Sequence, residues 1–379
     1  MSNKYCISDR VNILGQALNS NKSKVAFLLG AGCPLSVCIE DKPLIPDIAG
    51  LTKDVYGELS HEQQQLAKKI KDGKGTIEDI LSRVRLLIEA IDDEEFKGLR
   101  KTDLEDMERA ICEKITAKVD KELPNDITSY HNLASWISGI PREYPIEIFT
   151  PNYDLLIESS LESKGIPYFD GFIGSRSAFF DLHSMEHEEL PARWVRLWKL
   201  HGSVNWWLDE NGRVFRGTSK KQEGGKQMIY PSHLKYSQSR RMPYLAMQDR
   251  LSNFLSKGQS VLVTSGYSFV DQHLNEIIIQ RLSANPRAVC FGLLYGNIEE
   301  YPDALKCAQK AMNLHLISKN AAFFAGEQKN WEEKDDNPYN YLEERENNTP
   351  ICKIGDFAFL CKFLLKQTGD YITEEKGEN

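Results

Sequence analysis

The chain has 379 residues and a formal net charge of −8 at pH 7, with 41% hydrophobic and 27% charged residues. This is the composition of a globular protein that is long enough for one large core or two smaller ones. No run of about 18 apolar residues is present, which excludes a membrane-spanning helix, and the acidic balance argues against a chain that binds nucleic acid by itself.

The eight cysteines are scattered and include no C-x-x-C pair. This argues against a zinc module and against a disulfide framework. The first ten residues lack the apolar core of a signal peptide. We therefore expect a cytoplasmic protein that holds no metal.

The first predicted strand is Lys24–Leu29, and it runs directly into Gly30, Ala31 and Gly32. Glycines after a strand let the backbone approach a pyrophosphate, whose charge a following helix N-terminus favours. The complete G-x-G-x-x-G pattern would need a glycine where the chain has Leu35. A purely structural tight turn therefore explains these glycines equally well.

A long helical stretch follows the first strand. Apolar residues recur every three or four positions over 76–92 and again over 104–119, which is typical of amphipathic helices. We interpret residues 54–137 as a helical insertion. Packing alone accounts for its pattern, and an oligomer or partner surface is the alternative.

Strands alternate with helices through the rest of the chain, which predicts an α/β fold with a Rossmann-like, doubly wound, mostly parallel sheet. Helices are expected from residue 155, over 274–282 and near the carboxyl end. The further strands are expected over 146–150, 194–200, 259–265, 288–295 and 313–318.

These elements divide the chain into four parts. Residues 1–53 and 138–318 form the Rossmann-like domain, which carries a hairpin insertion over 203–245. Within that insertion, Asn211 and Gly212 are predicted to supply the positive φ angles of a tight turn. Residues 319–379 are predicted to be a polar loop, extending to about residue 350, followed by a C-terminal helix and a polar tail.

Polar residues follow three of the predicted strands at their carboxyl ends, where ligands bind in a parallel sheet. The first and last sets have a second explanation as a helix cap, which is favoured for the first pair taken alone. The alternative for the histidine is a structural hydrogen-bonding role. An imidazole at such an edge can exchange a proton at neutral pH, and hydroxyls there can hold a ribose. The residues are Asn152 and Asp154, then His201, then Ser265, Gly266 and Ser268 with Asp271 beyond.

Taken in order, these segments resemble the sirtuin family. FLLGAG is similar to its glycine-rich opening and IPD to its cofactor-loop motif. TPNYD resembles T-Q-N-[IV]-D, LHG resembles the segment of the catalytic histidine, and TSGYS resembles G-T-S. The resemblance implies NAD as the substrate.

The same resemblance implies a role for each matching residue. Asn152 would orient the nicotinamide-side ribose and water, His201 would be the general base, and Asp154 would recognise nicotinamide. Further contacts to NAD are implied for Gly30, Ala31, Gly32, Asp47, Ser265, Gly266, Ser268 and Asp271.

The chain also departs from the sirtuin pattern. Sirtuin deacylases carry two C-x-x-C pairs for zinc after the catalytic histidine, where this chain has a hairpin with Trp206 and Trp207. Pro34 and Pro151 replace a serine and a glutamine of the family, and no Phe-Arg follows IPD. These changes affect the acyl-lysine cleft and leave Asn152 and His201 in place.

The segments GYSFVDQHLNEII and GDFAFLCKFL resemble the bacterial sirtuin-like branch used in defence against phage. That branch is similar to NAD hydrolases with helical insertions and large oligomers. The resemblance therefore implies NAD hydrolysis without zinc, a homo-oligomer and a HerA-type ATPase as partner. The alternatives are an NAD-dependent lysine deacylase and a non-hydrolytic subunit that senses NAD or ADP-ribose.

Overall fold

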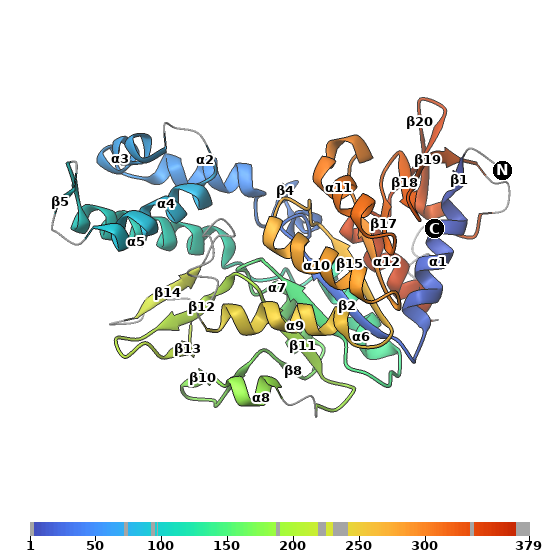
Figure 1. Ribbon diagram of the computed structural model, residues 1–379, viewed down its shortest axis with the longest axis horizontal. Helices are drawn as coiled ribbons and strands as arrows, with labels where there is room; N and C mark the ends of the chain where they lie inside the picture. The colour runs from blue at the N-terminus through green and yellow to red at the C-terminus, as the bar shows by residue number, and fades with distance from the viewer. Residues whose placement is uncertain are drawn as a thin grey trace.

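The computed structural model describes residues 4–71, 75–91, 95–96, 98–186, 190–218, 225–229, 242–333 and 337–368. Its centre is a ten-stranded sheet with the order β1-β19-β18-β17-β16-β15-β2-β7-β11-β8 (Figure 1). The strands from β17 to β8 are all parallel to their neighbours. The expected α/β fold with a mostly parallel sheet is confirmed.

The strands of this sheet are short, and nearly all residues of the central ones are buried. In spatial order they are β1 (Tyr5–Cys6), β19 (Glu327–Glu332), β18 (Ala321–Phe324), β17 (Leu314–Ile317), β16 (Ala288–Leu293), β15 (Ser260–Ser265), β2 (Lys24–Leu29), β7 (Glu147–Thr150), β11 (Val195–Lys199) and β8 (Tyr168–Phe169).

Helices cover both faces of the sheet, because successive side chains of a strand point to opposite faces. In β2, Val25, Phe27 and Leu29 join one apolar cluster, while Ala26 and Leu28 join another. The first cluster includes side chains of α1 (Ile7–Asn19), α6 (Ser129–Gly139) and α12 (Phe357–Gln367). The second includes those of α9 (Tyr244–Ser256), α10 (Gln272–Ala284) and α11 (Pro302–Lys310).

The direction of chain travel across the sheet reverses at β2. From β2 the chain moves to β7 on one side, and later to β15 on the other. A doubly wound sheet binds ligands outside the carboxyl ends of the strands at such a switch point. The topology therefore places the loops after β2, β7 and β15 around one crevice.

A helical module follows β2 and projects to the left in Figure 1. It comprises α2 (Ile48–Glu58), α3 (His61–Lys71), α4 (Ile77–Ala90) and α5 (Lys101–Val119). A buried ion pair joins α4 to α5, with Arg85 Nε 2.5 Å from Glu108 Oε1. α6 lies on the main sheet instead, since Trp136 packs edge-on against Phe27 with ring centroids 5.5 Å apart.

The predicted hairpin is part of a second, five-stranded sheet with the order β14-β12-β13-β10-β9. These strands are β14 (Lys226–Ile229), β12 (Gly202–Leu208), β13 (Val214–Arg216), β10 (Ala178–Phe180) and β9 (Phe172–Ile173). The predicted tight turn is wrong in detail: only Gly212 has a positive φ, of 76°, and the loop closes more widely through Asp209 and Arg213.

The prediction of a loop over about 319–350 is wrong. β18 and β19 extend the main sheet there, and β20 (Glu343–Glu346) pairs with β21 (Thr349–Cys352). The segment reads as polar because β19 lies near the edge of the sheet and buries only Trp331. The predicted C-terminal helix is present as α12, and the polar tail over 372–379 lies outside the described residues.

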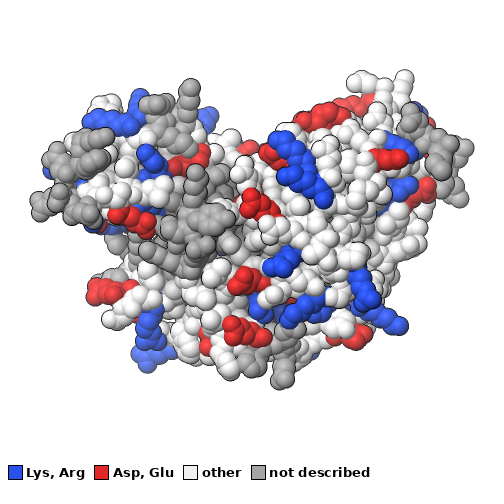
Figure 2. Space-filling model, in the orientation of Figure 1, with Lys and Arg blue, Asp and Glu red and all other residues white. Residues whose placement is uncertain are grey.

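No helix in the described ranges is both long and apolar enough to cross a bilayer. On the face drawn in Figure 2, Lys and Arg side chains lie among Asp and Glu side chains, and the surface is hollowed between the helical module and the part that carries α11 and β20.

Candidate functional site

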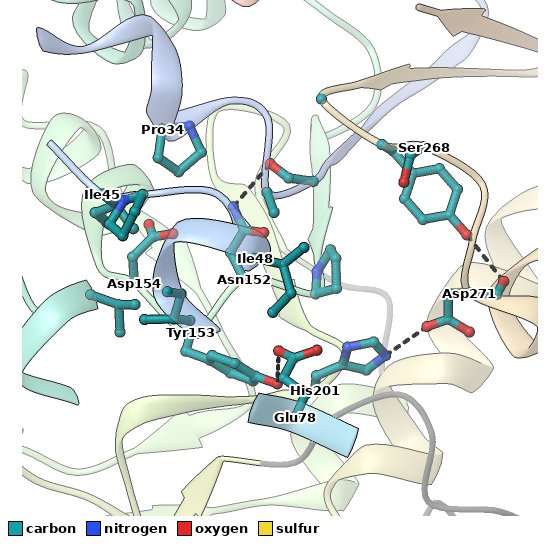
Figure 3. Close-up of a pocket in the computed structure, with 18 of the residues that line it drawn as sticks. Pro34, Ile45, Ile48, Glu78, Asn152, Tyr153, Asp154, His201, Ser268 and Asp271 are labelled. Carbon is teal, nitrogen blue, oxygen red and sulfur yellow. Dashed lines mark hydrogen bonds and ion pairs between the residues drawn. The ribbon is translucent and has the colours of Figure 1, made fainter. Parts of the chain in front are cut away.

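The carboxyl ends of β2, β7, β11 and β15 border one cavity of about 260 Å³ at the switch point of the sheet (Figure 3). The structure brings together eight of the eleven residues predicted to form the site. Those lining the cavity are Gly30, Ala31, Asn152, Asp154, His201, Gly266, Ser268 and Asp271.

The other three predicted residues lie outside this lining. Asp47 is the N-cap of α2, where its Oδ1 accepts a hydrogen bond from the backbone N–H of Gly50 at 2.7 Å. Gly32 and Ser265 do not line the cavity, and Ser265 is completely buried at the end of β15. Contacts of these three residues with NAD remain predictions.

The glycines after β2 allow two loops to pack backbone against backbone. The N–H of Gly30 donates to the carbonyl of Ser265, and the N–H of Gly32 donates to the carbonyl of Gly266, both at 2.9 Å. A Cβ on Gly30 would lie 2.4 Å from the carbonyl oxygen of Gly266. Packing therefore explains the glycines without a nucleotide, and it also holds the backbone of the cavity wall in place.

Replacing Gly30 by alanine is expected to destabilise the fold by roughly 1–3 kcal/mol, because the added methyl group must displace backbone atoms. The matched control is Gly57→Ala on α2, where a Cβ meets nothing within 4 Å. That change is expected to stabilise the protein by about 0.5–1 kcal/mol. Urea denaturation of both variants measures the two effects, and equal stabilities would contradict the packing argument.

Asn152 is fixed to the glycine loop. Its backbone N–H donates to Thr150 Oγ1 at 3.0 Å, and its side-chain amide donates to the carbonyl of Gly30 at 3.1 Å. The N-cap residue of α7 (Leu156–Ser163) is Leu155, which makes no side-chain capping bond, while Asp154 Oδ1 accepts from the N–H of Leu156 at 3.1 Å. Asn152 is thus held by a contact across the sheet and not by the helix that follows it.

A buried lysine lies directly behind Asp154. Lys199 Nζ is 3.0 Å from Glu158 Oε1 and also donates to the backbone carbonyl of Asp154. Burial raises the pKa of both the Asp154 and the Glu158 carboxyl groups, and the charge of Lys199 offsets part of this rise. One cation and two carboxylates at this site therefore have little access to water.

His201 is oriented by a carboxylate. Its Nε2 lies 3.0 Å from Asp271 Oδ2, and the two side chains are only 12% and 9% exposed. The other oxygen of Asp271 accepts from the N–H groups of His273 and Leu274 at the start of α10. Burial alone would raise the pKa of Asp271, but the hydrogen bond and charge of His201 outweigh it and the pKa is lowered.

This pair determines what the imidazole can do. When Nε2–H donates to Asp271, the lone pair of the neutral ring is on Nδ1, which is then the nitrogen that accepts a proton. The carboxylate also stabilises the imidazolium that forms. The sequence did not predict this contact, because His201 and Asp271 are 70 positions apart and no signal in the sequence pairs them.

The helical module also contributes to the cavity, which the sequence did not predict. The side chains come from α2, from the start of α4 and from the end of α5. They are Ile48, Leu51, Thr76, Glu78 and Val119. Within the described residues, no group of three or more His, Cys, Asp or Glu side chains is arranged to hold a metal ion.

A family model for the SIR2-like domain matches residues 146–317. This segment runs from β7 to β17 and contains Asn152, Asp154, His201 and residues 265–271, which supports a sirtuin-like protein. None of the curated protein sequences compared with the chain matches it.

Several solved structures are similar to the chain at low sequence identity. A structure described for the mechanism and regulation of Sir2 enzymes is 14% identical, with a TM-score of 0.39, and the match covers 84% of this chain and 93% of that chain. A Sir2 homologue mutant with ADP-ribose is 13% identical, with a TM-score of 0.38 and coverage of 96% and 99%. A Sir2 homologue with NAD is 14% identical, with a TM-score of 0.36 and coverage of 80% and 89%.

Proposed function

We propose that the protein is an NAD hydrolase that cleaves the nicotinamide–ribose bond and releases nicotinamide and ADP-ribose. The observation that carries this proposal is the convergence of Asn152 and His201 on one cavity, from separate strand ends and with the glycine loop of β2 beside them. The match of this region to a SIR2-like domain is consistent with NAD as the substrate.

Each side chain has a distinct task in this proposal. Cleavage passes through an oxocarbenium-like state at the ribose, as in glycoside hydrolysis. Asp154 contacts the nicotinamide carboxamide, and Asn152 orients the ribose and the attacking water. His201, with Asp271 behind it, takes a proton from a ribose hydroxyl or from that water, which contributes about 10²–10⁴-fold to the rate.

The lack of C-x-x-C pairs favours water over an acyl-lysine as the second substrate. In this chain Ile48, Leu51 and Val119 of the helical module line the cavity, together with Pro34 and Ile45 of the preceding loop. The sequence has no C-x-x-C pairs from which the zinc module of a deacylase would be built.

Incubation with NAD alone is expected to release nicotinamide, and an acetylated peptide should not increase the rate. The measurement is chromatographic quantification of nicotinamide and ADP-ribose with and without the peptide. Release that depends on the peptide would identify a deacylase. Binding of NAD by calorimetry with no product in either reaction would favour the sensing subunit.

We further propose that this activity depletes NAD in the cytoplasm during defence against phage, in a homo-oligomer that associates with a HerA-type ATPase. The support is the resemblance of residues 266–278 and 355–364 to the bacterial defence branch of the family. Native mass measurement, with and without such an ATPase, tests the assembly. Phage plating on cells that carry the wild-type chain or Asn152→Ala tests the role in defence.

A further inference from the structure

A carboxylate from the helical module faces the proposed reaction site. Glu78 lies in the first turn of α4 and lines the cavity together with His201 and Asn152. Figure 3 shows the carboxylate of Glu78 in the same cavity as the imidazole of His201, which is paired with Asp271. Glu78 does not belong to any of the strand-end motifs, because it lies on a helix more than 70 positions before Asn152 in the chain.

The position of Glu78 is well fixed by its own helix. Thr76 and Asp79 form a reciprocal capping box, in which Thr76 N–H donates to Asp79 Oδ2 at 2.8 Å and Asp79 N–H donates to Thr76 Oγ1 at 3.2 Å. The N–H of Ile77 donates to Thr52 Oγ1 of α2 at 3.0 Å. These hydrogen bonds fix the first turn of α4, which carries Glu78.

Tyr153, in the loop after β7, also holds the carboxylate of Glu78. Tyr153 OH donates to Glu78 Oε1 at 2.9 Å. Tyr153 is itself anchored, since its carbonyl accepts from Val204 N–H at 3.0 Å and from Ser203 Oγ at 3.3 Å. The loop after β7 and the helical module therefore meet at this carboxylate, and β12 fixes Tyr153 from behind.

We propose that Glu78 binds the hydroxyl groups of the nicotinamide-side ribose. This inference rests on the proposed function for its choice of substrate. A ribose presents hydroxyl donors, and a carboxylate is the acceptor that holds such donors most strongly. Its negative charge beside the anomeric carbon also favours the positive charge that develops there when the glycosidic bond breaks.

The test compares two ligands that differ only in the ribose under discussion. ADP-ribose carries that sugar and ADP lacks it. Glu78→Gln keeps the shape of the side chain and an acceptor for Tyr153 OH while removing the charge. Calorimetry is expected to show about tenfold weaker binding of ADP-ribose to Glu78→Gln and unchanged binding of ADP, the size typical of one hydrogen bond to a charged group.

Two further variants separate binding from a structural role. Tyr153→Phe removes the hydrogen bond from Tyr153 to Glu78 and leaves the carboxylate, so it should weaken ADP-ribose binding less than Glu78→Gln does. Glu89→Gln, at the exposed end of the same helix, should leave both affinities unchanged. If Glu78 only held Tyr153 in place, Tyr153→Phe would have the larger effect and Glu78→Gln nearly none.

The binding experiment does not depend on turnover. If Glu78→Gln selectively weakens the binding of ADP-ribose but the wild-type chain releases no nicotinamide, hydrolysis fails and the role of Glu78 stands. If Glu78→Gln weakens both ligands equally, or neither, the role of Glu78 fails while hydrolysis stands. A wild-type chain that binds neither ligand would overturn both proposals.

Discussion

Replacing His201 by alanine is expected to reduce nicotinamide release from NAD by about 10²–10⁴-fold, the usual contribution of a general base. Replacing Asn152 by alanine is expected to have an effect of similar size. Asn152 is expected to act by positioning, because its amide is fixed to the carbonyl of Gly30 and its side chain faces the cavity. Initial rates of nicotinamide formation at saturating NAD measure both effects.

A change in folding must be separated from a change in chemistry in these variants. His61→Ala is a suitable control, because His61 is an exposed histidine on α3, away from the cavity lining. It should retain full activity, and all three variants should keep native circular dichroism spectra. Turnover by His201→Ala at the wild-type rate would remove His201 from the mechanism.

Asp271→Asn tests the pair formed by His201 and Asp271. Asparagine retains an oxygen that can accept from the N–H groups of His273 and Leu274, so the start of α10 should persist. It cannot stabilise an imidazolium by charge. We therefore expect Asp271→Asn to lower turnover while leaving the thermal transition close to that of the wild type, whereas an unchanged rate would limit Asp271 to its capping role.

The strands that build the site could be predicted from sequence because each is a short apolar run followed by polar residues. The predicted span of β2 agrees with the structure at both ends, and β7, β11 and β15 agree within one residue at each end. Parallel strands expose their carboxyl ends at one edge. That rule was sufficient to place Asn152 and His201 together.

Contacts made across the molecule could not be predicted in the same way. The signal around Asp271 is that of a helix cap, and its contact with His201 depends on how β11 and β15 are spaced in the sheet. Glu78 is one of three acidic residues on the amphipathic helix α4, and only the position of the helical module turns it toward the cavity. Ser265, by contrast, was expected to contact NAD and is buried at the end of β15, against the loop that follows β2.

The largest expected loss of stability concerns Lys199, the buried cation behind the site. Replacing it by methionine leaves Glu158 and Asp154 buried without their countercharge, while the aliphatic part of the side chain is conserved. Removing one partner of a buried ion pair typically costs about 3–5 kcal/mol. Urea denaturation at neutral pH should show a loss in this range.

The exposed pair Lys118 and Glu58 provides the control for this experiment. Their charged atoms are 2.7 Å apart, close to the separation of Lys199 and Glu158, but the side chains are 27% and 45% exposed. Lys118→Met is therefore expected to cost much less than Lys199→Met, as is usual for an ion pair in contact with water. Equal losses in the two variants would show that burial of Lys199 is not the cause.

The effect of Lys199→Met should also depend on pH in a defined direction. The pKa values of Asp154 and Glu158 are already raised by burial, and removal of Lys199 raises them further. A raised carboxyl pKa means that the folded state binds more protons than the unfolded state, so stability falls as pH rises from the unfolded pKa to the folded one. The variant should therefore regain stability as the pH is lowered toward the unfolded value of about 4. Adding Glu158→Gln to Lys199→Met should restore part of the loss at neutral pH, because it removes one of the two uncompensated charges.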